Sequence, residues 1–144
     1  MNRSIIRILA TLLFVASAHV LAANAAHVEL HGKRFSIEIA ETEAEHEHGL
    51  MERTHMAADH GMLFVFQDDK PRAFWMKNTK IPLDMLFFDA DKHLVSVKHN
   101  APPCTADPCP VYSSGAPARY VLELNAGQAA KLNLTPGDVI QIHR

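Results

Sequence analysis

The run FWMKNTKIPLD, residues Phe74–Asp84, places two apolar segments on either side of a polar turn. Its first three residues, Phe74–Met76, are apolar and predict a short strand. Asn78 and Thr79 favour a turn because their side chains bond to nearby backbone groups. The Ile81–Pro82 step supports this turn, since the residue before a proline is disfavoured in helices. A new strand is therefore expected at Leu83.

Short apolar or alternating segments lie on both sides of this run and predict further strands. They are His27–Leu30, Arg34–Ala40, Gly61–Phe66, Leu83–Phe88, Leu94–Lys98, Arg119–Leu124 and Val139–His143. His31–Lys33 predicts a hairpin turn between the first two, and Asp89–Lys92 predicts another. Gln67–Pro71 is polar and contains proline, which predicts a break between Gly61–Phe66 and Phe74–Met76.

Helix signals are fewer. Thr42 and Glu45 match a capping box, which predicts a helix that ends near Gly49 or Arg53. A second short helix is expected over Asn125–Leu132, with Asn125 as a possible cap. Strands outnumber helices and do not alternate with them regularly. The predicted class is α+β, mostly β: an antiparallel barrel-like or sandwich sheet with one or two short helices.

The first 25 residues predict a cleavable export signal. Cations at Arg3 and Arg7 precede an apolar run and then small residues, the order that a signal peptide requires. Cleavage after Ala22 or after Ala25 fits. The alternative is a membrane anchor, but the apolar run is short for about 30 Å of hydrocarbon. We expect a periplasmic or secreted protein whose residues 26–144 form one domain without a stable membrane anchor.

The net charge limits the kinds of binding partner, and the cysteine content indicates how the two cysteines are used. Removal of residues 1–25 leaves 12 basic and 16 acidic residues, a net charge of −4. Without a basic stripe, nucleic acid is not an expected partner. We expect a monomer, and no cofactor is indicated. Cys104 and Cys109 form a close, even pair, which in an oxidising compartment predicts a disulfide. A redox pair or two metal thiolates are the alternatives.

At Phe74–Asp84 the chain resembles the uncharacterised bacterial and archaeal family called domain of unknown function 192. The resemblance covers about residues 28–143 and implies a small, β-rich domain that is exported or tethered to a membrane, with no established activity. Its other motifs follow in order: Gly49–Met51 with Arg53, Gly61–Phe64, Phe87 with Asp89, Val121–Leu124 with Ala126–Gly127, and Gly137–Asp138.

The main candidate site is the surface around this run. An apolar wall with a few convergent polar groups is typical of small-ligand pockets. The ligand-binding candidates are Arg53, Trp75, Lys77, Asn78, Thr79, Asp84 and Glu123. We expect an unknown small molecule or an exported protein to bind there. The alternative is structural: the polar groups serve the turn, Asp84 bonds to loop amides, and Glu123 pairs with Arg119 or Arg53.

Two further hypotheses remain open. The first is a copper-handling site, because imidazole and thioether ligands suit copper. Its candidates are His46, His48, His55, His60, Met51 and Met56, of which His48, Met51 and His55 would share a face of a longer helix. The second is a hydrolase-like enzyme that uses Asp84 and Glu123 as a carboxylate pair with nearby histidines such as His93 and His99. No reaction class follows from these residues, and we expect binding rather than catalysis.

Overall fold

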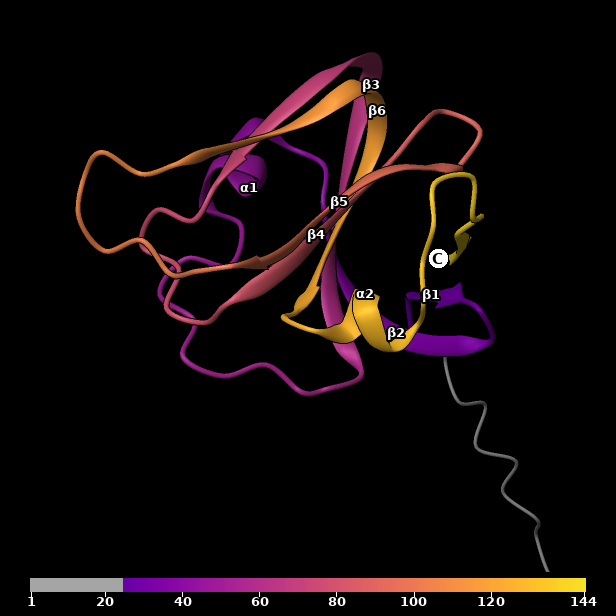
Figure 1. Cartoon of the computed structure of the whole chain (residues 1–144), viewed down its shortest axis with the longest axis horizontal. Coiled ribbons are helices and arrows are strands. Elements are labelled where there is room, and N and C mark those ends of the chain that lie inside the picture. The colour runs from indigo at the N-terminus through magenta and orange to yellow at the C-terminus, as the bar shows by residue number, and fades with distance from the viewer. Residues whose placement is uncertain (1–24) are drawn as a thin grey trace, which may run out of the picture.

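Two long antiparallel strands form the middle of the structure (Figure 1). They are β3 (His60–Trp75) and β6 (Val111–Asn125). The computed structural model describes residues 25–144, so the predicted export signal lies almost wholly outside the described residues. The other elements are β1 (His27–Leu30), β2 (Lys33–Ala40), α1 (Glu43–His48), β4 (Leu83–Phe88), β5 (Leu94–Ala101), α2 (Gln128–Lys131) and β7 (Gln141–His143).

The seven strands form one curled sheet in the order β5-β4-β6-β3-β2-β1-β7. This confirms the predicted class, with mostly β structure, a half-barrel shape and two short helices. All neighbouring strands are antiparallel except β2 and β3, which run parallel. A parallel pair needs a crossover connection, and α1 with the following residues 49–59 supplies it. In residues 25–144, no helix has the length and apolar character to span a bilayer.

The break expected at Gln67–Pro71 is wrong, because β3 continues through it. The register of β3 against β6 shifts between Val65 and Lys70 and again before Ala73. Such irregularities bend a strand and leave residues unpaired, so polar side chains and a proline are tolerated there. For the same reason β6 begins at Val111, earlier than the predicted strand.

The predicted start of the first helix is confirmed. The Thr42 hydroxyl accepts a hydrogen bond from the Glu45 amide, and the Glu45 carboxylate accepts one from the Thr42 amide. The helix ends at His48, and Gly49 follows with a φ of 45°. The second helix begins after Gly127 rather than at Asn125. Asn125 instead donates to the Met56 and Ala57 carbonyls.

Each face of the sheet carries its own apolar cluster. On β3, Leu63 and Val65 belong to one cluster, and Met62 and Phe64 belong to the other. The cluster with α2 against it is here called the α2-side cluster, and the one near α1 the α1-side cluster. Gly61 allows β3 and β6 to approach closely, because a Cβ there would lie 2.5 Å from the Glu123 carbonyl oxygen.

Candidate functional site

A narrow slot opens on the α1 side of the sheet. Its walls come from the end of α1, the adjoining residues 49–51, β3 and the segment 77–79. Glu123 of β6 lies on the sheet side of the slot. The slot has a volume of about 30 Å³, which is room for one or two water-sized groups.

Glu123 is buried without a partner. It is 4% exposed and lies opposite Met62 on β3 and Met85 on β4. Within residues 25–144, no group donates a hydrogen bond to its carboxyl group or pairs with it, and burial raises its pKa to about 8. In residues 25–144, every side-chain oxygen or nitrogen that is fully inaccessible to solvent has a hydrogen-bond partner. The carboxyl oxygens of Glu123 have none, so they are not fully inaccessible. Because Glu123 lines the slot, its carboxyl group is in contact with it.

An outer hollow of about 380 Å³ adjoins the slot and shares Glu47, His48, Met51, Trp75 and Lys77 with it. Trp75 is 44% exposed and forms an aromatic wall. The Lys77 ammonium group lies 5.3 Å from the centroid of the Trp75 ring, and it also pairs with Asp107 at 3.2 Å. The hollow therefore combines a flat apolar surface with charges of both signs, as expected of a small-ligand pocket.

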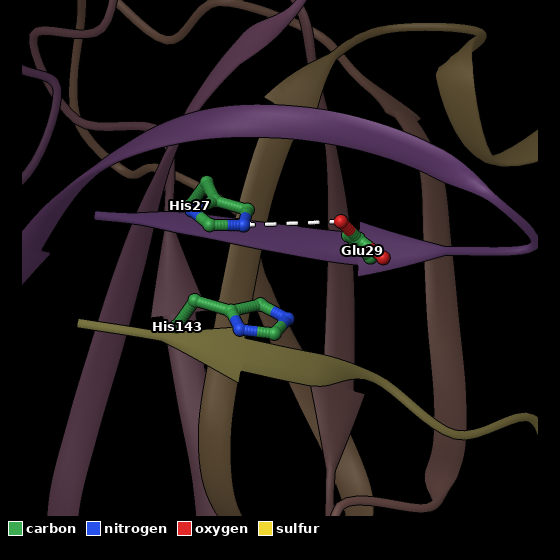
Figure 2. A group of neighbouring side chains, drawn as sticks. All are labelled: His27, Glu29 and His143. Carbon is green, nitrogen blue, oxygen red and sulfur yellow. Dashed lines mark ion pairs between the residues drawn. The ribbon is translucent and has the colours of Figure 1, made fainter. Parts of the chain in front are cut away.

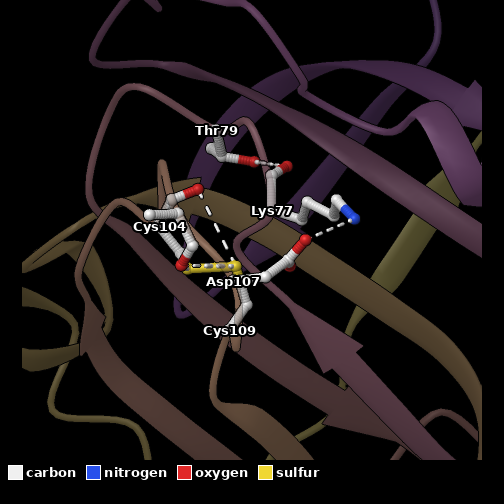
Figure 3. The surroundings of a disulfide bond; sticks show 6 residues. Lys77, Thr79, Cys104, Asp107 and Cys109 are labelled. Carbon is white, nitrogen blue, oxygen red and sulfur yellow. Dashed lines mark hydrogen bonds and ion pairs between the residues drawn. A yellow bond between two sulfur atoms is a disulfide. The ribbon is translucent and has the colours of Figure 1, made fainter.

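The segment 77–79 is held by the disulfide loop, which Figure 3 shows beside it. Cys104 and Cys109 form a disulfide. The Cys104 amide donates to the Met76 carbonyl at 3.2 Å, and the Asn78 amide donates to the Cys104 carbonyl at 2.9 Å. Asn78 has a φ of 54°, a conformation that asparagine tolerates better than most residues. The Thr79 hydroxyl donates to the Lys77 carbonyl at 3.4 Å.

Five of the seven predicted ligand-binding residues are thus brought together. Lys77, Trp75 and Asn78 line the outer hollow, and Thr79 and Glu123 line the slot. Arg53 and Asp84 lie elsewhere. Arg53 pairs with Glu38, and Asp84 accepts hydrogen bonds from backbone amides, so the two side chains have separate partners.

Asp84 lies on the opposite face of the sheet from Glu123. The register pairs Asp84 with Leu124 and Met85 with Glu123, and adjacent strand residues point to opposite faces. One Asp84 carboxylate oxygen accepts from the Asn100 amide and the other from the Ala129 amide of α2, both at 2.9 Å. The predicted Asp84–Glu123 carboxylate pair is therefore not formed, and Asp84 instead anchors α2.

Arg53 connects the crossover to β2. Its guanidinium group pairs with both carboxylate oxygens of Glu38, at 2.5 and 2.9 Å. Arg53, more than His60, lowers the pKa of Glu38. His60 also lies 2.9 Å from Glu38 through Nε2 and 2.8 Å from the Ser36 hydroxyl through Nδ1. This serine–histidine–glutamate chain differs from a catalytic triad, in which Nε2 faces the serine and Nδ1 faces the carboxylate.

No motif singles out this chain of side chains, because its members come from two strands, β2 and β3, whose parallel pairing was not expected. Arg119 pairs with Asp69, so neither arginine considered for Glu123 reaches it.

The histidines of the copper hypothesis do not converge. The helix ends at His48, so His48, Met51 and His55 do not share a helical face. His46 lies 3.0 Å from the Ala40 carbonyl through Nε2, and its ring packs on Phe66. Among residues 25–144, no three of the histidines between positions 46 and 60 bring ligand atoms together.

Several residues that line the slot and the hollow were not among the predicted ligand-binding residues. Glu47 lines both, while Leu50, Phe64 and Phe74 line the slot. The last three belong to the motifs Gly49–Met51, Gly61–Phe64 and Phe74–Asp84, but their position beside Glu123 depends on how the crossover carries α1 over the sheet. Glu47 lies outside these motifs, and its signal in the sequence was the capping box, which fixes where α1 begins.

The chain belongs to the family DUF192, described as "Uncharacterized ACR", whose model matches residues 26–142. Two solved structures are similar to it, each with a TM-score of 0.73. One is from Sinorhizobium meliloti 1021 and is assigned provisionally as a transcription regulator; it is 38% identical, and the match covers 81% of this chain and 91% of that one. The other, of unknown function, is from Novosphingobium aromaticivorans DSM 12444; it is 36% identical, with 81% and 82% covered. No curated protein matches the chain.

Proposed function

We propose that this protein is an exported binding module for a small molecule with a cationic nitrogen. The observation that carries the proposal is the Glu123 carboxyl group, which is buried, unpartnered within residues 25–144, and in contact with the slot. A buried carboxyl without a partner is costly to ionise, and a cationic nitrogen bound beside it lowers this cost.

The surroundings favour a cation over an anion. Glu47 adds a second carboxylate at the mouth, and the one lysine of the hollow, Lys77, is already paired with Asp107. Phe74 and Trp75 offer aromatic faces, which attract ammonium groups as well as apolar groups. The small slot takes the ammonium group, and the hollow takes the apolar remainder of the ligand.

The provisional assignment of the Sinorhizobium relative does not alter this proposal. A role in transcription requires contact with nucleic acid or with a regulator in the same compartment. The net charge of −4 for residues 26–144 disfavours direct contact with nucleic acid.

The test uses the protein recovered after export, labelled with ¹⁵N and titrated with butylammonium and with 1-butanol. We expect saturable amide shifts for the ammonium compound alone, at Lys77–Thr79 and in the β6 residues around Glu123. Calorimetry in two buffers with different ionisation enthalpies should show proton release, because the bound cation ionises Glu123.

Glu123→Gln should abolish this binding and its proton release. Glu47→Gln removes an exposed carboxylate at the same mouth and serves as the matched control, with a smaller loss of affinity. Equal affinity in Glu123→Gln and the unmodified protein would refute the proposal, as would equal binding of butylammonium and 1-butanol.

A further inference from the structure

A second cluster of side chains lies at the other end of the sheet, far from Glu123 in strand order. His27 and Glu29 are on β1, and His143 is on the edge strand β7. Residues two apart on a strand share a face, so His27 and Glu29 point the same way. The register places His143 directly opposite His27. Figure 2 shows the His27 ring above the His143 ring, with Glu29 farther along the strand of His27.

The three side chains are close enough to share one ion. One ligand atom from each lies within 4.8 Å of the others. Around a tetrahedral zinc ion, ligand atoms about 2.0–2.2 Å from the metal are roughly 3.3 Å apart. Glu29 and His143 retain exposure, so rotation of these two side chains can bring their ligand atoms to that spacing.

The His27 ring is held in a state suited to a metal ligand. Its Nδ1 lies 3.1 Å from the Ala25 carbonyl, an acceptor, so Nδ1 carries the hydrogen and Nε2 keeps its lone pair. A histidine ligand commonly has its second nitrogen bonded in this way. Cleavage after Ala22 would keep the Ala25 carbonyl, whereas cleavage after Ala25 would remove it; either cleavage keeps the side chains of His27, Glu29 and His143.

The His27 Nε2 atom lacks a partner within residues 25–144. The side chain of His27 is 9% exposed, and the nearest acidic oxygen, on Glu29, is 3.8 Å from Nε2, too far for a hydrogen bond. The His27 and His143 rings stack at 4.4 Å with an interplanar angle of 4°. Stacking alone would account for the rings, but it leaves the His27 Nε2 atom without a partner and gives Glu29 no role.

We infer that His27, Glu29 and His143 form a binding site for a divalent transition-metal ion, with zinc and copper as the ions to test. Two imidazoles and one carboxylate are a ligand set of open zinc sites, in which water occupies the fourth position. Bound metal would join β7 to β1 and so fasten the edge of the sheet. This site is independent of the proposed ammonium-binding slot and shares no residue with it.

The experiment uses the exported protein, stripped of metal with a chelator and then titrated with Zn²⁺ and, separately, Cu²⁺. We expect one ion per chain by native mass spectrometry, with a dissociation constant in the micromolar range or below by calorimetry. The electron paramagnetic resonance spectrum of the copper form should show coupling to two imidazole nitrogens. Hydrogen exchange of the β7 amides should slow when metal is added.

His143→Gln and Glu29→Gln remove ligands that retain exposure, so both variants are expected to fold. Each should weaken binding at least ten-fold and abolish the protection of β7. His99→Gln removes an exposed histidine on β5 and is the matched control; it should leave the affinity unchanged. No bound ion at micromolar metal, or equal affinity in His143→Gln and His99→Gln, would overturn the inference.

Discussion

Glu123 occupies a strand whose other residues in that region are apolar, and its neighbours show why its burial matters. Leu122 and Leu124 pack in the α2-side cluster, while Val121 packs in the α1-side cluster. Glu123 therefore points to the α1 side, where Met62 and Met85 flank it. The folded protein is more stable when this carboxyl group is protonated, because burial disfavours its charged form.

The variant Glu123→Gln should change how stability depends on pH. Burial raises the folded-state pKa of Glu123 to about 8, well above the ordinary value of 4.5 for a glutamate. Its contribution is therefore fully present below pH 4.5 and declines as the pH rises to about 8. Glutamine removes this decline, so the variant should be more stable at pH 8, by an amount on the order of 3–4 kcal/mol.

Urea unfolding at pH 5 and pH 8 measures this difference. Glu47→Gln is the control, since Glu47 is exposed and its replacement should leave the pH dependence as it was. If the Glu123→Gln variant loses as much stability between pH 5 and pH 8 as the unmodified protein does, Glu123 is not the cause of this pH dependence.

For individual residues, the sequence predicted the turn in the segment 75–79 well, because turn formation depends on neighbouring residues. The sequence could not predict that Asp84 and Glu123 lie on opposite faces of the sheet. Which face each carboxylate occupies depends on the register of β4 against β6, and a shift of one residue would exchange the faces. The pairing of Asp84 with α2 amides depends on that register too.

At the scale of elements, the two hairpins and the capped helix followed from short-range signals and were confirmed. The parallel pairing of β2 with β3 and the continuous β3 were not predictable in the same way. The parallel pairing depends on an irregular crossover segment. The continuity of β3 depends on bulges that let a polar, proline-containing stretch remain within a strand. Both arrangements are set by distant partners rather than by local sequence.

The disulfide loop and the segment 77–79 should behave as one unit. Replacing both Cys104 and Cys109 with serine should cost about 2 kcal/mol of stability, the low end expected for a short closed loop. Because the backbone of residue 104 bonds to Met76 and Asn78, the Asn78 amide should exchange faster with solvent. Hydrogen exchange measured by NMR tests this.

The amides of the β1–β2 hairpin provide the internal control. In the sheet, β1 and β2 are not adjacent to β5 or β6, the two strands that the disulfide loop joins. The exchange of the hairpin amides should be unchanged in the double variant. If Asn78 remains as protected as before, the backbone bonds alone hold the segment, and the disulfide has no role in shaping the hollow.

For the whole molecule, export and folding should be linked through the disulfide. Oxidising compartments permit a structural disulfide, whereas the cytoplasm keeps thiols reduced. The full chain, produced in a bacterium with a periplasm, should be recovered there with its N-terminus at Ala23 or Ala26 and both cysteines oxidised. Intact mass and thiol alkylation measure these two properties in one sample.

A matched chain that lacks residues 1–25 should remain in the cytoplasm with free thiols at positions 104 and 109. Its unfolding midpoint should be lower than that of the exported form and should recover when the thiols are oxidised in vitro, because residues 26–144 are otherwise identical. Recovery of the full chain in the membrane at its uncleaved mass would instead support the anchor. In that case the disulfide should still form, since the domain would face the same oxidising compartment, so the mass and the membrane location, not the thiols, would distinguish the two forms.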